Sequence, residues 1–139
     1  MPSAVVVADT GPLLAAADQG DPDHAASVSQ LARGDLRFVI PAPVATETAQ
    51  MIARRLGSVA EAKFHRALAT QEVEPLALED FTRIAELIEQ YADFPLGGVD
   101  ASVIALAERL GTALVLTLDH RHFAAVRPSH CHSLELLPA

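Results

Sequence analysis

The stretch VVVADTGPLL, residues 5–14, contains the transition from strand to helix that decides the fold. Its first four residues are apolar and three of them are valine, which predicts a short parallel strand over 5–8, buried on both faces. Thr10 can cap the helix that follows, and Pro12 falls in the first turn of that helix. Asp9 therefore stands at the junction where the strand ends and the helix begins.

A second strand followed by an acid lies near the other end of the chain, in LVLTLDHRHF, residues 114–123. The apolar run predicts a strand over 113–117, and Asp119 follows it closely. In parallel sheets, ligands bind at the carboxyl ends of the strands. We therefore expect Asp9 and Asp119 to lie at the same edge of one sheet.

Strands and helices alternate between these two stretches, which predicts an α/β fold with a mainly parallel central sheet. Gly34, Gly57 and Gly111 are the expected helix stops. The remaining strands are expected at 38–40, 73–76 and 134–137, the last of them at a sheet edge, and the helices at 21–33, 41–56, from 58 onward, 78–91 and 100–110.

The composition limits the classes of protein to consider. The chain has 139 residues, half of them apolar, and its mean hydropathy is +0.25, so a single domain over residues 1–139 can bury a sizeable core. Ten Lys and Arg against eighteen Asp and Glu give a formal net charge of −8, a poor overall match to a nucleic acid. An RNA or DNA substrate would need a local basic patch, a metal ion, or both.

The sequence also bears on the compartment. Cys131 is the only cysteine, which excludes an intramolecular disulfide and fits a reducing cytosol. The N-terminus lacks the basic region of a signal peptide, and no apolar stretch approaches the roughly 20 residues of a membrane span. We expect a cytoplasmic protein with no membrane partner.

Two further acids complete a candidate cluster: Glu47 in PAPVATETAQ and Asp100 in PLGGVDASVIALAERLG, both near the starts of expected helices. Singly, each acid also fits an ordinary role as a helix cap, a dipole partner, a turn residue or a solvated helix residue. Together they have no basic partner close in sequence, and such a group repels itself unless a divalent cation or raised pKa values stabilise it. Carboxylates that bind a metal ion are typical of active sites that cleave phosphodiester bonds. We therefore take four acids as candidate metal ligands and catalytic residues: Asp9, Glu47, Asp100 and Asp119.

Other polar residues near this cluster are expected to support it. The hydroxyl of Thr117 can hold a carboxylate or a metal-bound water, although its own backbone is the ordinary partner for it. Residues 120–122 follow Asp119 immediately and are expected on the rim of the acidic site. Seven other acids lie among polar neighbours and are expected on solvated faces: Glu72, Glu74, Glu79, Asp80, Glu86, Glu89 and Glu108.

Several other motifs are present but incomplete. The tripeptides HRH (120–122) and HCH (130–132) resemble parts of a zinc site, the second with both histidines on one strand face, but no CxxC accompanies them. The DTG at 9–11 matches the aspartic-protease tripeptide, yet those enzymes need two copies in an all-β fold. A phospho-acceptor receiver domain needs a lysine after its last strand, whereas Lys63 is the only lysine. No glycine-rich nucleotide-binding loop is found.

Taken together, VVVADTGPLLAAAD, PAPVATETA, PLGGVDASVIALAERLG and TLDHRHF resemble PIN-domain proteins, and more closely VapC-type toxins of bacterial toxin–antitoxin pairs. The likeness extends over residues 5–137. It implies a PIN-like three-layer α/β/α sandwich and a ribonuclease dependent on Mg²⁺ or Mn²⁺. The acidic quartet of the family would fall on Asp9, Glu47, Asp100 and Asp119, and its auxiliary hydroxyl on Thr117.

The resemblance also implies partners: an RNA substrate, a cognate antitoxin that inhibits the active site, and a second copy in a homodimer, with a dimer surface expected within residues 43–68. A metal-activated water would attack the scissile phosphate. Two alternatives stay open, a non-catalytic PIN-like interaction module and a metal-dependent nuclease acting on structured DNA. The candidates for phosphate contacts are Arg54, Arg55, Arg121 and Arg127.

Overall fold

The computed structural model describes residues 3–138, in which five strands and seven helices alternate. The strands are β1 (Ala4–Ala8), β2 (Leu36–Pro41), β3 (Glu72–Glu74), β4 (Leu114–Leu116) and β5 (Glu135–Leu137). The helices are α1 (Thr10–Ala17), α2 (His24–Leu31), α3 (Ala42–Leu56), α4 (Ser58–Leu68), α5 (Leu78–Gln90), α6 (Gly98–Leu110) and α7 (His120–Ala125). Among these helices, none is long and apolar enough to cross a membrane.

The five strands form one sheet in the order β3-β2-β1-β4-β5, and every pair is parallel. β1 is central, with Val7 in register with Val39 of β2 on one side and Val115 of β4 on the other. All three valines are buried, which explains why the central strands have continuous apolar sequences. The segments that follow β1, β2 and β4 therefore meet at one edge of the sheet.

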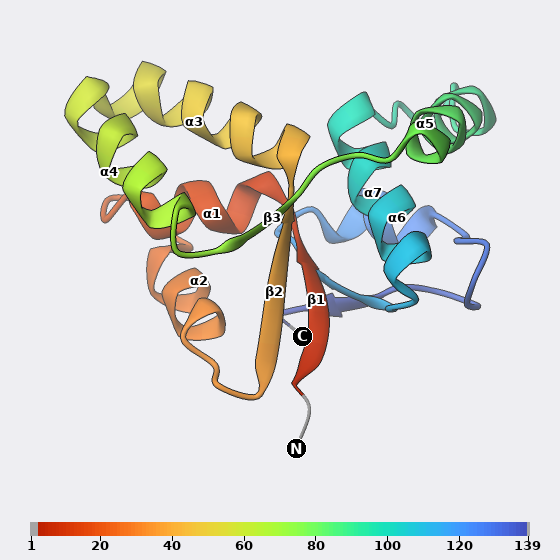
Figure 1. Ribbon diagram of the computed structural model, residues 1–139, viewed down its shortest axis with the longest axis horizontal. Coiled ribbons are helices and arrows are strands. Elements are labelled where there is room, and N and C mark those ends of the chain that lie inside the picture. Colours follow the sequence, from red (N-terminus) through yellow and green to blue (C-terminus); the bar gives the residue numbers. More distant parts are fainter. Residues whose placement is uncertain (1–2, 139) are drawn as a thin grey trace.

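The helices cover both faces of this sheet, giving three layers. Figure 1 shows α1 to α4 on one side of β1 and β2, and α5 to α7 on the other. The chain moves from β1 to β3 in one direction and returns to β4 and β5 on the far side of β1, so right-handed crossovers place the two sets of helices on opposite faces. The expected α/β/α sandwich and the expected edge position of the last strand are confirmed.

Helix α6 is the most deeply buried helix of the fold. Seven consecutive residues, Ala101 to Ala107, are buried, because α6 contacts α3, α5 and the central strand β1. The side chains expected to point inward, Val103, Ile104 and Ala107, are each fully buried. This packing fixes the position of Asp100, which lies in the first turn of α6.

Two of the expected helix stops depend on glycine. Gly57 ends α3 with φ 89°, and Gly111 ends α6 with φ 69°, a left-handed conformation that residues with a side chain rarely adopt. Other boundaries differ from expectation. The second helix covers only His24–Leu31, because a turn precedes it and a second turn follows it, and α7 was not predicted from its six residues, HRHFAA.

The expectation that Asp80 and Glu108 lie on solvated faces is wrong. The side chain of Asp80 is 3% exposed and accepts from Arg109 Nε at 3.0 Å, and that of Glu108 is 9% exposed and accepts from Arg83 Nε at 2.7 Å. Asp80 also accepts a 2.8 Å hydrogen bond from the backbone of Ala77 at the start of α5. These pairs join α5 to α6, and a buried carboxylate needs such partners.

Candidate functional site

The four acids selected from the sequence line one pocket at the carboxyl edge of the sheet. The pocket has a volume of about 490 Å³ and lies between α1, α3, α6 and the segment after β4. Its lining consists of Asp9, Thr10, Gly11, Leu14, Glu47, Met51, Asp100, Leu118 and Asp119. Segments up to 110 positions apart in the sequence therefore contribute to one acidic concavity.

Asp9 is held at the end of the central strand. Its backbone amide donates to Leu116 at 2.9 Å, and only 6% of the residue is exposed. The hydroxyl of Thr117 donates to Asp9 Oδ2 at 2.8 Å and accepts from the backbone amide of Asp119 at 2.9 Å. Thr117 thus links two of the acids, one through its carboxylate and the other through its backbone.

Glu47 reaches the pocket from the second turn of α3 and is held by a residue that we expected elsewhere. Thr10 Oγ1 donates to Glu47 Oε2 at 2.7 Å. Thr10 was predicted to cap α1, but Asp9 occupies the N-cap position and Thr10 is the first helical residue. Its side chain is therefore free to bind across the pocket, 37 positions along the chain.

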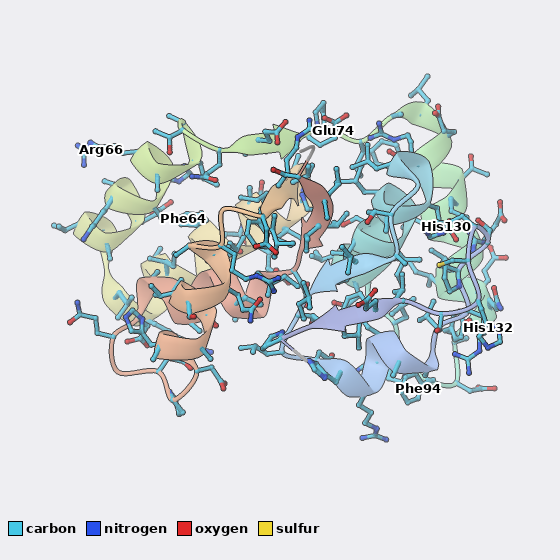
Figure 2. All side chains as sticks on the ribbon, turned by 90° about the horizontal axis from the view of Figure 1, so that it is seen from below. Phe64, Arg66, Glu74, Phe94, His130 and His132 are labelled. Carbon is cyan, nitrogen blue, oxygen red and sulfur yellow. The ribbon has the colours of Figure 1, made fainter. Side chains whose placement is uncertain are left out.

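Asp119 caps α7 and binds a histidine. The backbone amide of His122 donates to Asp119 Oδ1 at 3.1 Å, and the His122 ring Nδ1 lies 2.9 Å from Oδ1 and 2.8 Å from Oδ2. The His122 ring packs against Phe94, with 4.7 Å between the ring centroids. Figure 2 shows Phe94 beside α7. The sequence placed His122 on the rim, but not its contact with Asp119, because α7 itself was missed.

The electrostatics of the pocket are those of closely spaced like charges. Burial, with a smaller effect from the charges of Asp100 and Asp119, raises the pKa of Asp9 to about 6, although hydrogen bonds from the Thr10 backbone and from Thr117 oppose the shift. Burial and then the charges of Asp119 and Glu47 raise the pKa of Asp100 as well. The charges of the neighbouring acids therefore disfavour ionisation of Asp9 and of Asp100, and a cation in the pocket would relieve that repulsion.

The donor set fits a hard divalent cation. Four carboxylates offer the oxygen ligands that Mg²⁺ and Mn²⁺ prefer. Within residues 3–138, no three Asp, Glu, His or Cys side chains lie close enough together to hold one ion as they stand. Binding would therefore draw the carboxylates inward. In the described part of the chain, no other side chain hydrogen-bonds the Asp100 carboxylate, whereas its backbone is held in the buried helix α6.

Among the described residues, the histidines at 130 and 132 form no metal-binding cluster. Residues 129–133 lie in bends before β5, so His130 and His132 do not share a strand face as the sequence had suggested. His130 Nε2 lies 2.7 Å from the carbonyl oxygen of Thr112, and Cys131 Sγ lies 3.4 Å from the carbonyl oxygen of Ser133. Figure 2 shows both histidines on this outer loop. The contact with Thr112 gives His130 a structural role, and His132 is exposed.

Comparisons with known proteins bear on the family and the fold of this chain. The PIN domain family matches residues 6–127. Ribonuclease VapC26 of Mycobacterium tuberculosis is 36% identical over 126 residues, covering 88% of this chain and 93% of the relative. Together these matches cover the whole candidate site.

Two solved structures share the fold. A crystal structure of Mycobacterium tuberculosis VapC20, described as a sarcin-ricin loop cleaving toxin, superposes with a TM-score of 0.74 at 20% identity, covering 79% of this chain and 86% of that one. The Rickettsia felis VapBC2 structure, bound to a promoter DNA fragment, gives a TM-score of 0.69 at 15% identity, covering 95% and 98%. At these identities the likeness shows the fold.

Proposed function

This chain belongs to the PIN-domain family, and from that premise we propose that it is a metal-dependent endoribonuclease of the VapC toxin type, acting in the cytoplasm as a single domain. The observation that carries the proposal is the convergence of Asp9, Glu47, Asp100 and Asp119 on one pocket. The name of the 36% identical relative, a ribonuclease, supports RNA as the substrate class.

The roles of the residues follow from their contacts. Asp9, Asp100 and Asp119 would hold one or two Mg²⁺ or Mn²⁺ ions, and Glu47 would bind directly or through water. When bound, the cation supplies an activated water and offsets negative charge on the scissile phosphate and the leaving oxygen.

The neighbours of the acids orient them for this task. Thr117 holds Asp9, Thr10 holds Glu47 and His122 holds Asp119, each through a hydrogen bond to a carboxylate oxygen. Partners of this kind fix ligand orientation, and their loss typically costs 10- to 100-fold in metal affinity or activity. Asp100 lacks such a side-chain partner, and its position depends instead on the buried helix α6.

The test is cleavage of a panel of RNAs, single-stranded DNA and branched DNA with Mg²⁺, with Mn²⁺ and with EDTA. We expect cuts in RNA with either ion and none in EDTA. Asp100→Asn should be inactive, whereas Glu86→Gln, which removes an exposed acid on α5, should cleave like the wild type. Cleavage in EDTA, or cleavage confined to branched DNA, would refute the proposal, and folded protein inert toward every substrate would favour the interaction module.

We also propose that the chain forms a homodimer and binds a cognate antitoxin with a basic segment. The acidic pocket would attract an Arg or Lys of the partner. The dimer is supported by a second groove of about 560 Å³, lined mostly by apolar residues of α3, α5 and the segment between β3 and α5, and sharing Glu47 with the acidic pocket. Phe81 lines this groove and is 58% exposed, and Val59, on α4 within the expected dimer surface, is 84% exposed.

Light scattering of Phe81→Glu and Val59→Glu tests both surfaces. A charge that breaks a dimer identifies its interface, and two variants that stay dimeric like the wild type would place the interface elsewhere. A wild-type protein that is monomeric at high concentration would remove the dimer from the proposal.

A further inference from the structure

The basic side chains of this acidic protein divide into two classes. Four arginines are engaged in ion pairs with carboxylates: Arg33 with Asp35, Arg37 with Glu72, Arg83 with Glu86 and Glu108, and Arg109 with Glu74 and Asp80. Each of these positive charges is compensated by the carboxylate of its ion-pair partner. They therefore contribute little to the binding of an additional anion.

The other six basic residues make no ion pair within residues 3–138, and they are not scattered. Four lie on the hairpin of α3 and α4, and two lie at α7 or just after it: Arg54, Arg55, Lys63, Arg66, Arg121 and Arg127. Arg127 donates to the carbonyl oxygens of Ala124 and Val126, which do not neutralise it. Figure 2 shows Arg66 projecting outward from α4.

These two groups flank the acidic pocket. The strand order puts β1 between β2 and β4, and Asp9 follows β1. The α3–α4 hairpin follows β2 on one side, and α7 follows β4 on the other (Figure 1). A ligand crossing the pocket from α3 to α7 would thus meet uncompensated cations before and after the carboxylates.

On α3, one helix face connects the pocket with the cations. Glu47 and Met51 both line the pocket, and Arg54 lies three residues after Met51 and seven after Glu47. Positions separated by three, four and seven residues share a helix face, so Arg54 lies about 10 Å further along the face that carries Glu47. Arg54 is exposed.

On the other side, Arg121 lies two residues after Asp119, in the first turn of α7. Its guanidinium carbon is 5.6 Å from the centroid of the Phe94 ring, and the residue is exposed. A cation stacked on an aromatic ring keeps its charge and its hydrogen-bond donors while losing conformational freedom. Arg121 is therefore held in place for an anionic ligand.

We propose that a single strand of RNA crosses the acidic pocket with its phosphates bound by Arg54 on one side and Arg121 on the other. The proposal rests on the function proposed above. Phosphate contacts with Lys and Arg supply most of the non-specific affinity for nucleic acids. A phosphate between the two arginines can share a divalent cation with the carboxylates, whereas an acidic peptide would present no such group at regular intervals.

The test is RNA binding by the full chain carrying Asp100→Asn, so that RNA stays intact with Mg²⁺ present. Fluorescence anisotropy of a labelled single-stranded RNA is measured at several salt concentrations. Adding Arg54→Ala or Arg121→Ala should weaken binding at low salt and reduce the slope of log affinity against log salt by about 0.7, the value for one phosphate contact on a single strand. Both changes together should reduce it about twice as much.

The matched controls are Arg33→Ala and Arg37→Ala, which change the net charge equally but lie at the amino edge of the sheet, where Arg37 is in register with Val5. They should leave the slope unchanged. Equal losses in the controls, or an unchanged slope for Arg54→Ala and Arg121→Ala with RNA binding intact, would overturn the path while leaving the nuclease proposal in place. Variants that bind RNA normally but lose a protein partner would assign this surface to that partner instead. A parent protein with no affinity for RNA would overturn the path, and RNA cleavage by the wild type would decide the nuclease proposal separately.

Discussion

The buried hydroxyl of Thr117 donates a 2.8 Å hydrogen bond to Asp9, which lies 108 positions earlier in the chain. The same oxygen accepts from the backbone of Asp119. The ends of β1 and β4 are therefore connected by one side chain directly beneath the acids. The spacing between Asp9 and Asp119 depends on this oxygen.

Replacing Thr117 by Val should remove the hydrogen bonds that its hydroxyl makes to Asp9 and to the Asp119 backbone, without opening a large cavity. We expect cleavage and Mn²⁺ affinity to fall about 10- to 100-fold, as for other residues that orient metal ligands. Thr117→Ser keeps the hydroxyl and should retain most of both. Wild-type Mn²⁺ affinity in Thr117→Val would show that Asp9 is positioned without it.

Asp100→Asn should abolish metal-dependent cleavage and yet raise the thermal stability of the metal-free protein. Burial and the charges of Asp119 and Glu47 disfavour the Asp100 carboxylate in the folded state, so a neutral amide of similar shape relieves that cost. Thermal unfolding in EDTA near pH 7.5 measures this, with Glu86→Gln as the control for loss of an exposed acid. A melting temperature below that of the wild type would contradict the prediction.

The stability of the metal-free protein should fall as the pH rises from about 4 to about 6. The pKa of Asp9 is about 6 in the folded state against an ordinary value of 3.8, so the folded state binds this proton more tightly and loses that advantage on deprotonation. The difference corresponds to about 3 kcal/mol between pH 4 and pH 7, as an order of magnitude. Urea unfolding in EDTA at several pH values, for the wild type and Asp9→Asn, isolates the contribution of this carboxyl.

Asp9→Asn should not show the Asp9 part of this pH dependence. Parallel stability profiles for the two proteins would mean that Asp9 titrates normally. Saturating Mg²⁺ should reduce the fall in wild-type stability between pH 4 and pH 6, because a bound cation favours the ionised carboxylate.

His122→Ala should weaken Mn²⁺ binding, measured by electron paramagnetic resonance, about 10- to 100-fold. The ring Nδ1 of His122 orients Asp119, and Asn at this position can place a donor nitrogen near the same point. His122→Asn should therefore recover much of the affinity. His120→Ala removes an exposed ring from the same helix and is the control. Equal Mn²⁺ affinities in all three variants would exclude a positioning role.

The sequence alone located the acids that follow strands, because that information is local. The apolar runs before Asp9 and Asp119 identify strand ends, and parallel sheets bring strand ends together. Asp100 was selected because it lies near the start of an expected helix. Glu47 was selected only because the other three acids already suggested a cluster. Local pattern was therefore sufficient for Asp9, Asp119 and Asp100, but not for Glu47.

What the sequence could not indicate depends on contacts between distant positions. Asp80 and Glu108 were expected in solvent because their partners, Arg109 and Arg83, lie 29 and 25 positions away. From the sequence, the Thr10 hydroxyl could equally have capped α1. It binds Glu47 instead because the fold brings this residue of α3 within hydrogen-bonding distance. Helix α7 was missed because its six residues carry too short an apolar pattern to show a period.

The adjacency of Asp9 and Thr10 has a consequence for how this protein can vary. These neighbours bind in different directions. Asp9 accepts a hydrogen bond from Thr117, directly after β4, and Thr10 donates one to Glu47 of α3. One residue inserted between them, or one removed, would rotate the start of α1 by about 100° and break one contact or the other. The junction after β1 should therefore not tolerate insertions or deletions. The turn before α2, at residues 18–23, can lengthen without displacing the acids of the pocket. Length variation among descendants of this chain should accumulate there, and engineered tags or sensor peptides belong there as well.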